Sequence, residues 1–223
     1  MTSRKSVDRI SQSEVALLKR LRQWYSGDVF DCLDALGIDG YLRGLSLASV
    51  LPTDGKICGR ASTIQFKPTR ARKTSRLYHR AIDASGPGTV LVVSTAGASG
   101  SCTGELMCEG ARVRGAEATI VDGSVRDVEQ VIGMGYPLFA RSIEPIGAVG
   151  RMEDTETGID IDVCGIRIQP DDIIFGDRDG LIAIPKGVAE IVADLADALG
   201  KKEKAFRKSI LAGDPLVQVF ADV

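Results

Sequence analysis

Residues 89–104 read TVLVVSTAGASGSCTG, an almost wholly apolar run followed at once by a glycine-rich turn. This run predicts a short strand over 89–94 that is buried on both faces, because a half-exposed strand would alternate apolar and polar residues. Residues 105–114 have helical spacing, and the apolar stretch 118–121 (ATIV) predicts a second buried strand. Strands at these spacings, with a helix between them, indicate parallel pairing through a right-handed crossover.

The flanking sequence extends this core in both directions. Further helices are predicted over 13–25, 26–36, 70–84 and 125–134, with a strand over 57–66. After Tyr136 the pattern becomes that of short strands, over 137–142, 143–149, 159–164, 166–169, 173–176 and 181–185. The tail over 187–213 predicts one long helix, or two divided at Gly200. We expect a flexible N-terminus over 1–10 and a single α/β domain over 11–223, in which a β-rich layer packs against a parallel βα core.

Composition limits the functions to consider. The chain has 223 residues and a net charge of −2, so no broad basic excess points to nucleic acid. We expect the basic cluster at residues 67, 70, 72, 73 and 76 to be the solvated face of a helix. The N-terminus lacks the apolar core of a signal peptide, and no apolar run approaches the ~20 residues that span a bilayer. Five cysteines without a CxxC pair are typical of reduced thiols, so a cytoplasmic protein without a membrane partner is expected.

The single histidine, His79, restricts the metal chemistry. Its helical context and neighbouring arginines favour a helix-surface or interface position over a catalytic one. One histidine cannot supply a His-rich zinc site, so the ligands of any metal must be mainly carboxylates and water. Such hard oxygen ligands favour Mg²⁺ or Mn²⁺ over zinc.

Two loops that each follow a buried strand are the candidate site. The turn over 96–107 is rich in glycine and leads into a helix start, whose free N–H groups suit a carboxylate or a phosphate. The second loop, 121–127 (VDGSVRD), places Arg126 beside Asp127 in the predicted first turn of a helix. Arg126 offers a planar fork to a carboxylate, and Asp127 offers a hard oxygen to Mg²⁺. A structural alternative is that Asp122 caps the helix while Arg126 and Asp127 make surface contacts.

These loops carry a family resemblance. Gly104-Glu105-Leu106, together with DGSVRD over 122–127, resembles the RraA-like family, which includes the 4-hydroxy-4-methyl-2-oxoglutarate / 4-carboxy-4-hydroxy-2-oxoadipate aldolases. Twenty residues lie between Glu105 and Arg126-Asp127, the spacing of the family's aldolase signature. Supporting matches extend over most of the chain, at residues 34–36, 59–63, 139–141, 170–172, 176–180 and 202–203.

The resemblance implies a fold, an assembly and a set of residue roles. The fold would be of the β-layered swivelling type (β/β/α), with a C-terminal helix, assembled as a homotrimer or a dimer of trimers. Asp127 would bind Mg²⁺ directly, while Glu105, and Glu203 from a neighbouring subunit, would hold it through water. The implied substrate contacts come from Arg126, which would hold the pyruvyl carboxylate and the enolate oxygen, and from Gly104, Leu106 and Met107 at the helix start.

The implied activity is that of a divalent-metal-dependent carbon–carbon lyase, an aldolase or oxaloacetate decarboxylase that acts on small 2-oxo acids through a pyruvate enolate. The alternative is a non-catalytic regulator that binds a ribonuclease. Asp127 discriminates between the two, because such regulators resemble this chain around the arginine but lack the acid that follows it. A third interpretation, a quinone-precursor methyltransferase, lacks the nucleoside-binding loop that it requires. Residues 147–151 (GAVGR) lack the lysine expected there in the tricarboxylate-cleaving aldolases, so the particular substrate stays open.

Overall fold

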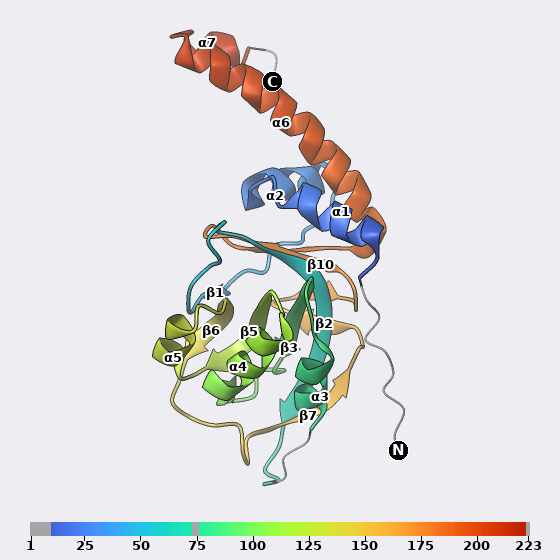
Figure 1. Ribbon diagram of the computed structural model, residues 1–223, viewed down its shortest axis with the longest axis vertical. Coiled ribbons are helices and arrows are strands. Elements are labelled where there is room, and N and C mark those ends of the chain that lie inside the picture. The colour runs from blue at the N-terminus through green and yellow to red at the C-terminus, as the bar shows by residue number, and fades with distance from the viewer. Residues whose placement is uncertain (1–9, 73–75, 222–223) are drawn as a thin grey trace.

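Residues 10–72 and 76–221 are described by the computed structural model of the chain (Figure 1). In this part of the chain nine strands form one mixed sheet. Four of these strands pair in parallel, in the order β6, β5, β3, β2, and form its core. Their bounds are β2 Ile57–Pro68, β3 Thr89–Ser94, β5 Ala118–Val125 and β6 Leu138–Ile143. The predicted parallel core is therefore confirmed, and β3 has the predicted bounds.

Antiparallel strands and a short parallel strand complete the sheet. On one side β1 (Ser46–Leu47) pairs with β6, and on the other β10 (Ile173–Gly176) and β11 (Leu181–Ile184) continue from β2. The long strand β2 also pairs with β7 (Met152–Thr157), and β4 (Ser101–Thr103) pairs in parallel with β5. A separate hairpin consists of β8 (Ile161–Val163) and β9 (Ile166–Ile168).

Both faces of the parallel core are covered. Leu91 and Val93 of β3 lie in a buried cluster with side chains of helices α3 (Leu77–Ala84), α4 (Glu105–Arg114) and α5 (Val128–Gly133). The alternate residues Val90 and Val92 point to the opposite face and pack in a cluster with the β8–β9 hairpin. Because each fully buried side chain of this kind contributes ~1.5–3 kcal/mol, the apolar run explains why this strand forms the centre of the sheet.

Helices α1 (Gln12–Leu21), α2 (Ser26–Ala35) and α6 (Ala189–Leu211) form a third cluster with β10 and β11. A short 3₁₀ helix, η1 (Lys186–Val188), precedes α6, and α7 (Leu216–Val219) follows it. The distal half of α6 projects beyond the body of the molecule (Figure 1). The predicted fold is confirmed in that the chain is a single α/β domain with a curled mixed sheet and a C-terminal helix.

Gly200 does not divide α6, which runs unbroken for 23 residues. The indole ring of Trp24 lies directly against this glycine, and a Cβ atom at position 200 would overlap the ring. Trp24 also donates its indole N–H to Asp197 on the same helix, at 3.1 Å. Gly200 is therefore a close-packing position, so the prediction of one long helix is confirmed and the alternative of two helices divided at Gly200 is wrong.

Three other predicted elements differ from the structure. The helix expected over 70–84 begins at Leu77. Within the basic cluster, Lys67 therefore belongs to β2, and Arg70 and Arg72 lie in irregular chain. Lys73 lies outside the described residues. Residues 144–149 form a loop, so the predicted strand over 143–149 is wrong, and β7 was not predicted. The helix expected from Val125 begins at Val128, because β5 continues through Val125. None of the helices in the described ranges is long and apolar enough to cross a membrane.

Candidate active site

The two candidate loops meet at the carboxyl ends of neighbouring parallel strands. Ser101 and Thr103 of β4 pair with Ser124 and Val125 of β5, so the glycine-rich turn lies beside the end of β5. The Arg126 N–H donates to the Thr103 carbonyl at 3.1 Å and joins the loops directly. Arg126 and Asp127 thus lie between strand and helix, and their predicted position in the first turn of a helix is wrong by one to two residues.

Asp127 adopts a backbone conformation that is rare for a residue with a side chain. Its φ of +57° and ψ of +36° lie in the left-handed region, which aspartate tolerates better than most residues do. Although Asp127 is the N-cap residue of α5, its side chain makes no capping hydrogen bond. Oδ2 instead accepts the Glu105 N–H at 3.3 Å and lies 3.5 Å from Nε of Arg126. The left-handed turn therefore directs the carboxylate toward the start of α4, away from its own helix.

Gly104, the N-cap residue of α4, makes this approach possible. A Cβ atom at position 104 would overlap the Asp127 carboxylate and would lie 3.1 Å from Cγ of Arg126. The space that a side chain would fill is thus occupied by the carboxylate. The missing side chain at Gly104 therefore lets the Asp127 carboxylate reach the start of α4.

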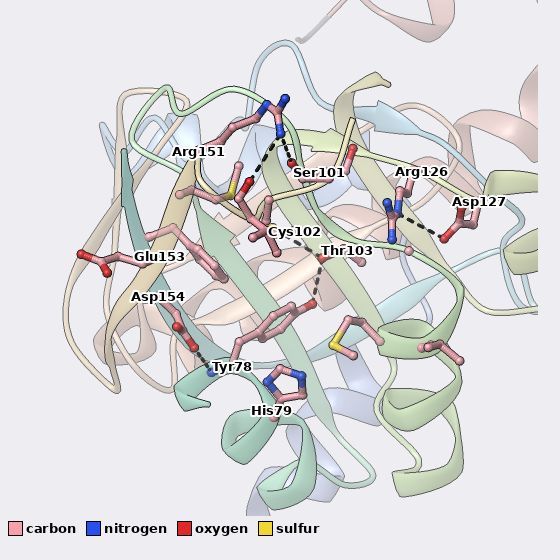
Figure 2. Close-up of a pocket in the computed structure, with 18 of the residues that line it drawn as sticks. Tyr78, His79, Ser101, Cys102, Thr103, Arg126, Asp127, Arg151, Glu153 and Asp154 are labelled. Atoms are coloured by element: carbon pink, nitrogen blue, oxygen red, sulfur yellow. Dashed lines mark hydrogen bonds and ion pairs between the residues drawn. The ribbon is translucent and has the colours of Figure 1, made fainter. Parts of the chain in front are cut away.

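A cavity of about 590 Å³ opens in front of these groups (Figure 2). Arg126 and Asp127 lie on one side of it, and Arg151, Glu153 and Asp154 lie across from them. Six of the predicted site residues line this cavity: Gly104, Glu105, Leu106, Met107, Arg126 and Asp127. Leu106 is 75% exposed, so the start of α4 borders open solvent at the mouth.

Glu203, the remaining predicted site residue, is not part of this cavity. It is exposed on the projecting half of α6. Within one chain the structure therefore does not bring Glu203 to Asp127, and its predicted role depends on a neighbouring subunit.

The cavity wall also contains residues that the sequence did not indicate. Tyr78 reaches from α3 to Thr103, with 2.9 Å between the two side-chain oxygens. Asp154 of β7 is 7% exposed, and its carboxylate accepts the Tyr78 N–H at 2.7 Å. Burial raises the pKa of the Tyr78 phenol well above its ordinary value, so the hydroxyl keeps its proton. These contacts join residues far apart in the chain, and no local sequence signal could have indicated them.

His79 lies on the exposed side of α3 and also lines the cavity. Its predicted helix-surface position is confirmed.

Asp122 does not cap α5, because its carboxylate pairs with Arg141 and accepts the Cys164 N–H at 2.9 Å. The structural alternative for this loop is therefore wrong in its assignment of a cap.

The oxygen donors at the candidate site fit a hydrated hard cation. No group of three or more His, Cys, Asp and Glu side chains suited to a metal occurs among the residues that the structure describes. Mg²⁺ usually keeps several waters and takes only one or two carboxylates from a protein. Asp127, with Glu105 on the adjacent helix start, offers such a set. The carboxylate is also partly accessible, with 39% of the Asp127 side chain exposed.

The fold and the site together define a class: an α/β protein with a curled mixed sheet, whose cavity holds an Arg-Asp pair at the start of a helix. The sequence model of the family described as RraA-like: Aldolase/RraA matches residues 27–183. The chain belongs to this family, as its motifs predict.

Individual relatives carry different names. Protein DlpA of Legionella pneumophila is 32% identical over 211 residues, which are 92% of this chain but only 33% of DlpA, so the chain spans about a third of that relative. A protein of Halalkalibacterium halodurans named "Putative 4-hydroxy-4-methyl-2-oxoglutarate aldolase" is 27% identical over 90% of this chain and 91% of its own length. The crystal structure of Streptomyces coelicolor RraAS2, described as an unusual member of the RNase ES inhibitor RraA protein family, superposes with a TM-score of 0.77 at 25% identity, covering 86% of this chain and 96% of that one. The names thus include both an aldolase and an inhibitor family.

Proposed function

We propose that this chain is a divalent-metal-dependent carbon–carbon lyase that acts on small 4-hydroxy-2-oxo acids or oxaloacetate through a pyruvate enolate. One observation carries the proposal. The Asp127 carboxylate is held by left-handed backbone against the side-chain-free Gly104, beside an exposed arginine and at the mouth of a cavity. Such an uncommon backbone conformation costs ~1–3 kcal/mol and is concentrated at functional sites.

Asp127 would hold Mg²⁺ or Mn²⁺ directly, and Glu105 would hold it through water, as would Glu203 of a neighbouring subunit in a homotrimer or a dimer of trimers. When bound, the cation would supply a Lewis acid that draws electrons from the 2-oxo group of the substrate. The hard oxygens of the Asp127 carboxylate support its own role as a ligand. The roles of Glu105 and Glu203 follow from the family resemblance.

The chain's own groups bind and orient the substrate. The Arg126 guanidinium would hold the substrate carboxylate and the oxygen that becomes negative as the enolate forms. At the start of α4 the N–H groups of Leu106 and Met107, with Gly104 before them, would bind the other carboxylate oxygen, since the first N–H groups of a helix have no partner within it.

The reaction balances without an oxidant or a reductant. In aldol cleavage the C3–C4 bond breaks, the C4 hydroxyl loses its proton to give a carbonyl product, and the electron pair stays on C3 as the pyruvate enolate. In decarboxylation the same enolate remains after oxaloacetate loses CO₂. A proton added at C3 then gives pyruvate in both cases.

The similarity to RraAS2 favours one alternative, a regulator that binds a ribonuclease. Asp127, the residue after Arg126, discriminates between the lyase and the regulator, since a regulator needs no carboxylate that lines a cavity. Asp127 therefore favours the enzyme, and a binding experiment with a purified ribonuclease tests the alternative separately.

Chelation is expected to abolish activity. The purified protein should release pyruvate from 4-hydroxy-2-oxo acids or oxaloacetate, lose this activity in excess EDTA and regain it with Mg²⁺ or Mn²⁺, because the proposed ligands are hard oxygens. The release is measured with a coupled pyruvate assay. Full turnover in excess chelator would contradict the metal mechanism, and inactivation by borohydride in the presence of pyruvate would indicate a Schiff-base lysine instead.

A further inference from the structure

A buried pair of hydroxyl groups lies in the wall of the cavity. Tyr78 is 3% exposed and Thr103 is 1% exposed, and 2.9 Å separates their hydroxyl oxygens (Figure 2). Both residues line the cavity. None of the roles derived above uses this pair.

Tyr78 is itself fixed on two sides. Its ring meets Phe66 of β2 edge to face, with 5.8 Å between the centroids and 83° between the planes. Its backbone N–H donates to the buried Asp154 of β7 at 2.7 Å. These two contacts hold Tyr78 of α3 against β2 and β7, and its hydroxyl extends from there to Thr103.

Thr103 belongs to one candidate loop and contacts the other, and so fixes their relative position. Its carbonyl accepts the Arg126 N–H at 3.1 Å, and in the sequence it immediately precedes Gly104, the N-cap residue of α4. A displacement of Thr103 would move Arg126 and the start of α4 together. Catalytic groups work only when they are held within about 0.5 Å of the productive geometry by packing and hydrogen bonds behind them.

We propose that Tyr78 is a positioning residue, whose hydroxyl holds Thr103 and thereby keeps Arg126 and the start of α4 in register with each other. This inference rests on the proposed function for its kinetic test. The hydrogen bonds that carry it exist whether or not the chain is a lyase, and they can be measured separately.

The chain provides a matched control in a second buried tyrosine–threonine pair. Tyr136 is 2% exposed, and its hydroxyl lies 3.0 Å from that of Thr119. Thr119 lies near the beginning of β5, at the end opposite Arg126. Tyr136→Phe therefore removes the same kind of buried hydrogen bond away from the cavity.

The variants Tyr78→Phe and Thr103→Val are expected to lower kcat/KM for pyruvate release by about 10- to 100-fold, as misplaced reacting groups do. Thr103→Ser, which keeps the hydroxyl, should retain activity, and so should Tyr136→Phe despite a similar fall in Tm. The double variant Tyr78→Phe/Thr103→Val should lose no more than either single variant, because both remove one shared interaction. Additive losses would contradict the proposal and would indicate that Tyr78 and Thr103 act separately.

Hydrogen exchange at the Arg126 amide provides a test that does not need activity. In Tyr78→Phe this amide should exchange faster than in the wild type, since its acceptor on Thr103 is less firmly held, whereas Tyr136→Phe should leave its rate unchanged. An unchanged rate in Tyr78→Phe, or activity within about twofold of the wild type, would overturn the positioning role. If the wild type releases no pyruvate, the proposed lyase activity is refuted. If the Arg126 amide nevertheless exchanges faster in Tyr78→Phe than in the wild type, the positioning role of Tyr78 still holds.

Discussion

Asp127→Asn is expected to lower kcat/KM by ~10²–10³-fold or more, with a steep fall in the apparent affinity for Mg²⁺. Asparagine keeps the shape of aspartate, can accept the Glu105 N–H and also tolerates left-handed backbone, so the loop should keep its conformation. What the variant loses is the charge that anchors the cation. Steady-state kinetics over a range of Mg²⁺ concentrations measure both effects.

The Tm of the same variant separates a catalytic role from a structural one. The Arg126–Asp127 ion pair is exposed, and such pairs contribute only ~0–1 kcal/mol to the free energy of unfolding. A nearly unchanged Tm is therefore expected. A clearly lowered Tm with full activity per folded molecule would show that Asp127 supports the scaffold. Alanine is a poorer replacement, because it would relax the left-handed turn as well as remove the charge.

Asp127→Asn can also test whether two subunits share one site. The variant is co-assembled in equal amounts with Glu203→Gln. Half of the sites then contain an intact Asp127, and half of those receive an intact Glu203 from the neighbouring subunit, so random association should restore about a quarter of the wild-type sites. Each variant alone should be impaired. Full activity of Glu203→Gln on its own would show that Glu203 is not part of the site. A fully active protein that is a monomer by light scattering would show that subunits do not share a site.

Arg126→Ala is expected to be equally damaging by another route. The variant removes the group proposed to bind the substrate carboxylate and the developing enolate oxygen, so KM should rise and kcat should fall, with a combined loss of ~10²–10³-fold or more in kcat/KM. The affinity for Mg²⁺ should change far less than in Asp127→Asn, because the cation's ligand remains.

Arg112→Ala provides the matched control for the loss of an arginine. Its side chain is 46% exposed, as is that of Arg126, and it also pairs with a nearby carboxylate, that of Glu109 on α4, outside the cavity. This variant should keep wild-type kinetics. If Arg126→Ala behaved like Arg112→Ala, the assignment of the site would be wrong.

The elements that the sequence predicts best are those whose signals are local. The almost wholly apolar run 89–94 is β3, and residues 105–114, which have helical spacing and lie between Gly104 and Gly115, are α4. The strand β7 escaped prediction because Met152–Thr157 is mostly polar. It pairs along β2 with Glu156 and Thr157 exposed.

Tertiary contacts overrode local signals elsewhere. A glycine within a helix costs ~1 kcal/mol relative to alanine, and this left two helices divided at Gly200 as an alternative to one long helix. The Trp24 ring occupies the space that any side chain at this position would need, so the helix continues. In the same way, β5 extends through the turn-forming residues 122–124 because β4 and β6 pair with its end, which moves the start of α5 to Val128.

The candidate site was predictable only in part. Arg126, Asp127 and Glu105 could be named from motif and resemblance, and the structure places all three at one cavity. The contacts of Tyr78 with Thr103 and Asp154 in the cavity wall could not be predicted, because they join residues 25 and 76 positions apart. Periodicity along a chain carries no information about such pairs.

The contact between Trp24 and Gly200 gives the protein an optical reporter of its own. Trp24 is the single tryptophan of the chain, so all indole fluorescence originates at the junction between α1 and the C-terminal helix. None of the residues that line the candidate site lies at this junction. Emission from Trp24 therefore follows the attachment of α6 to the body of the molecule without a label.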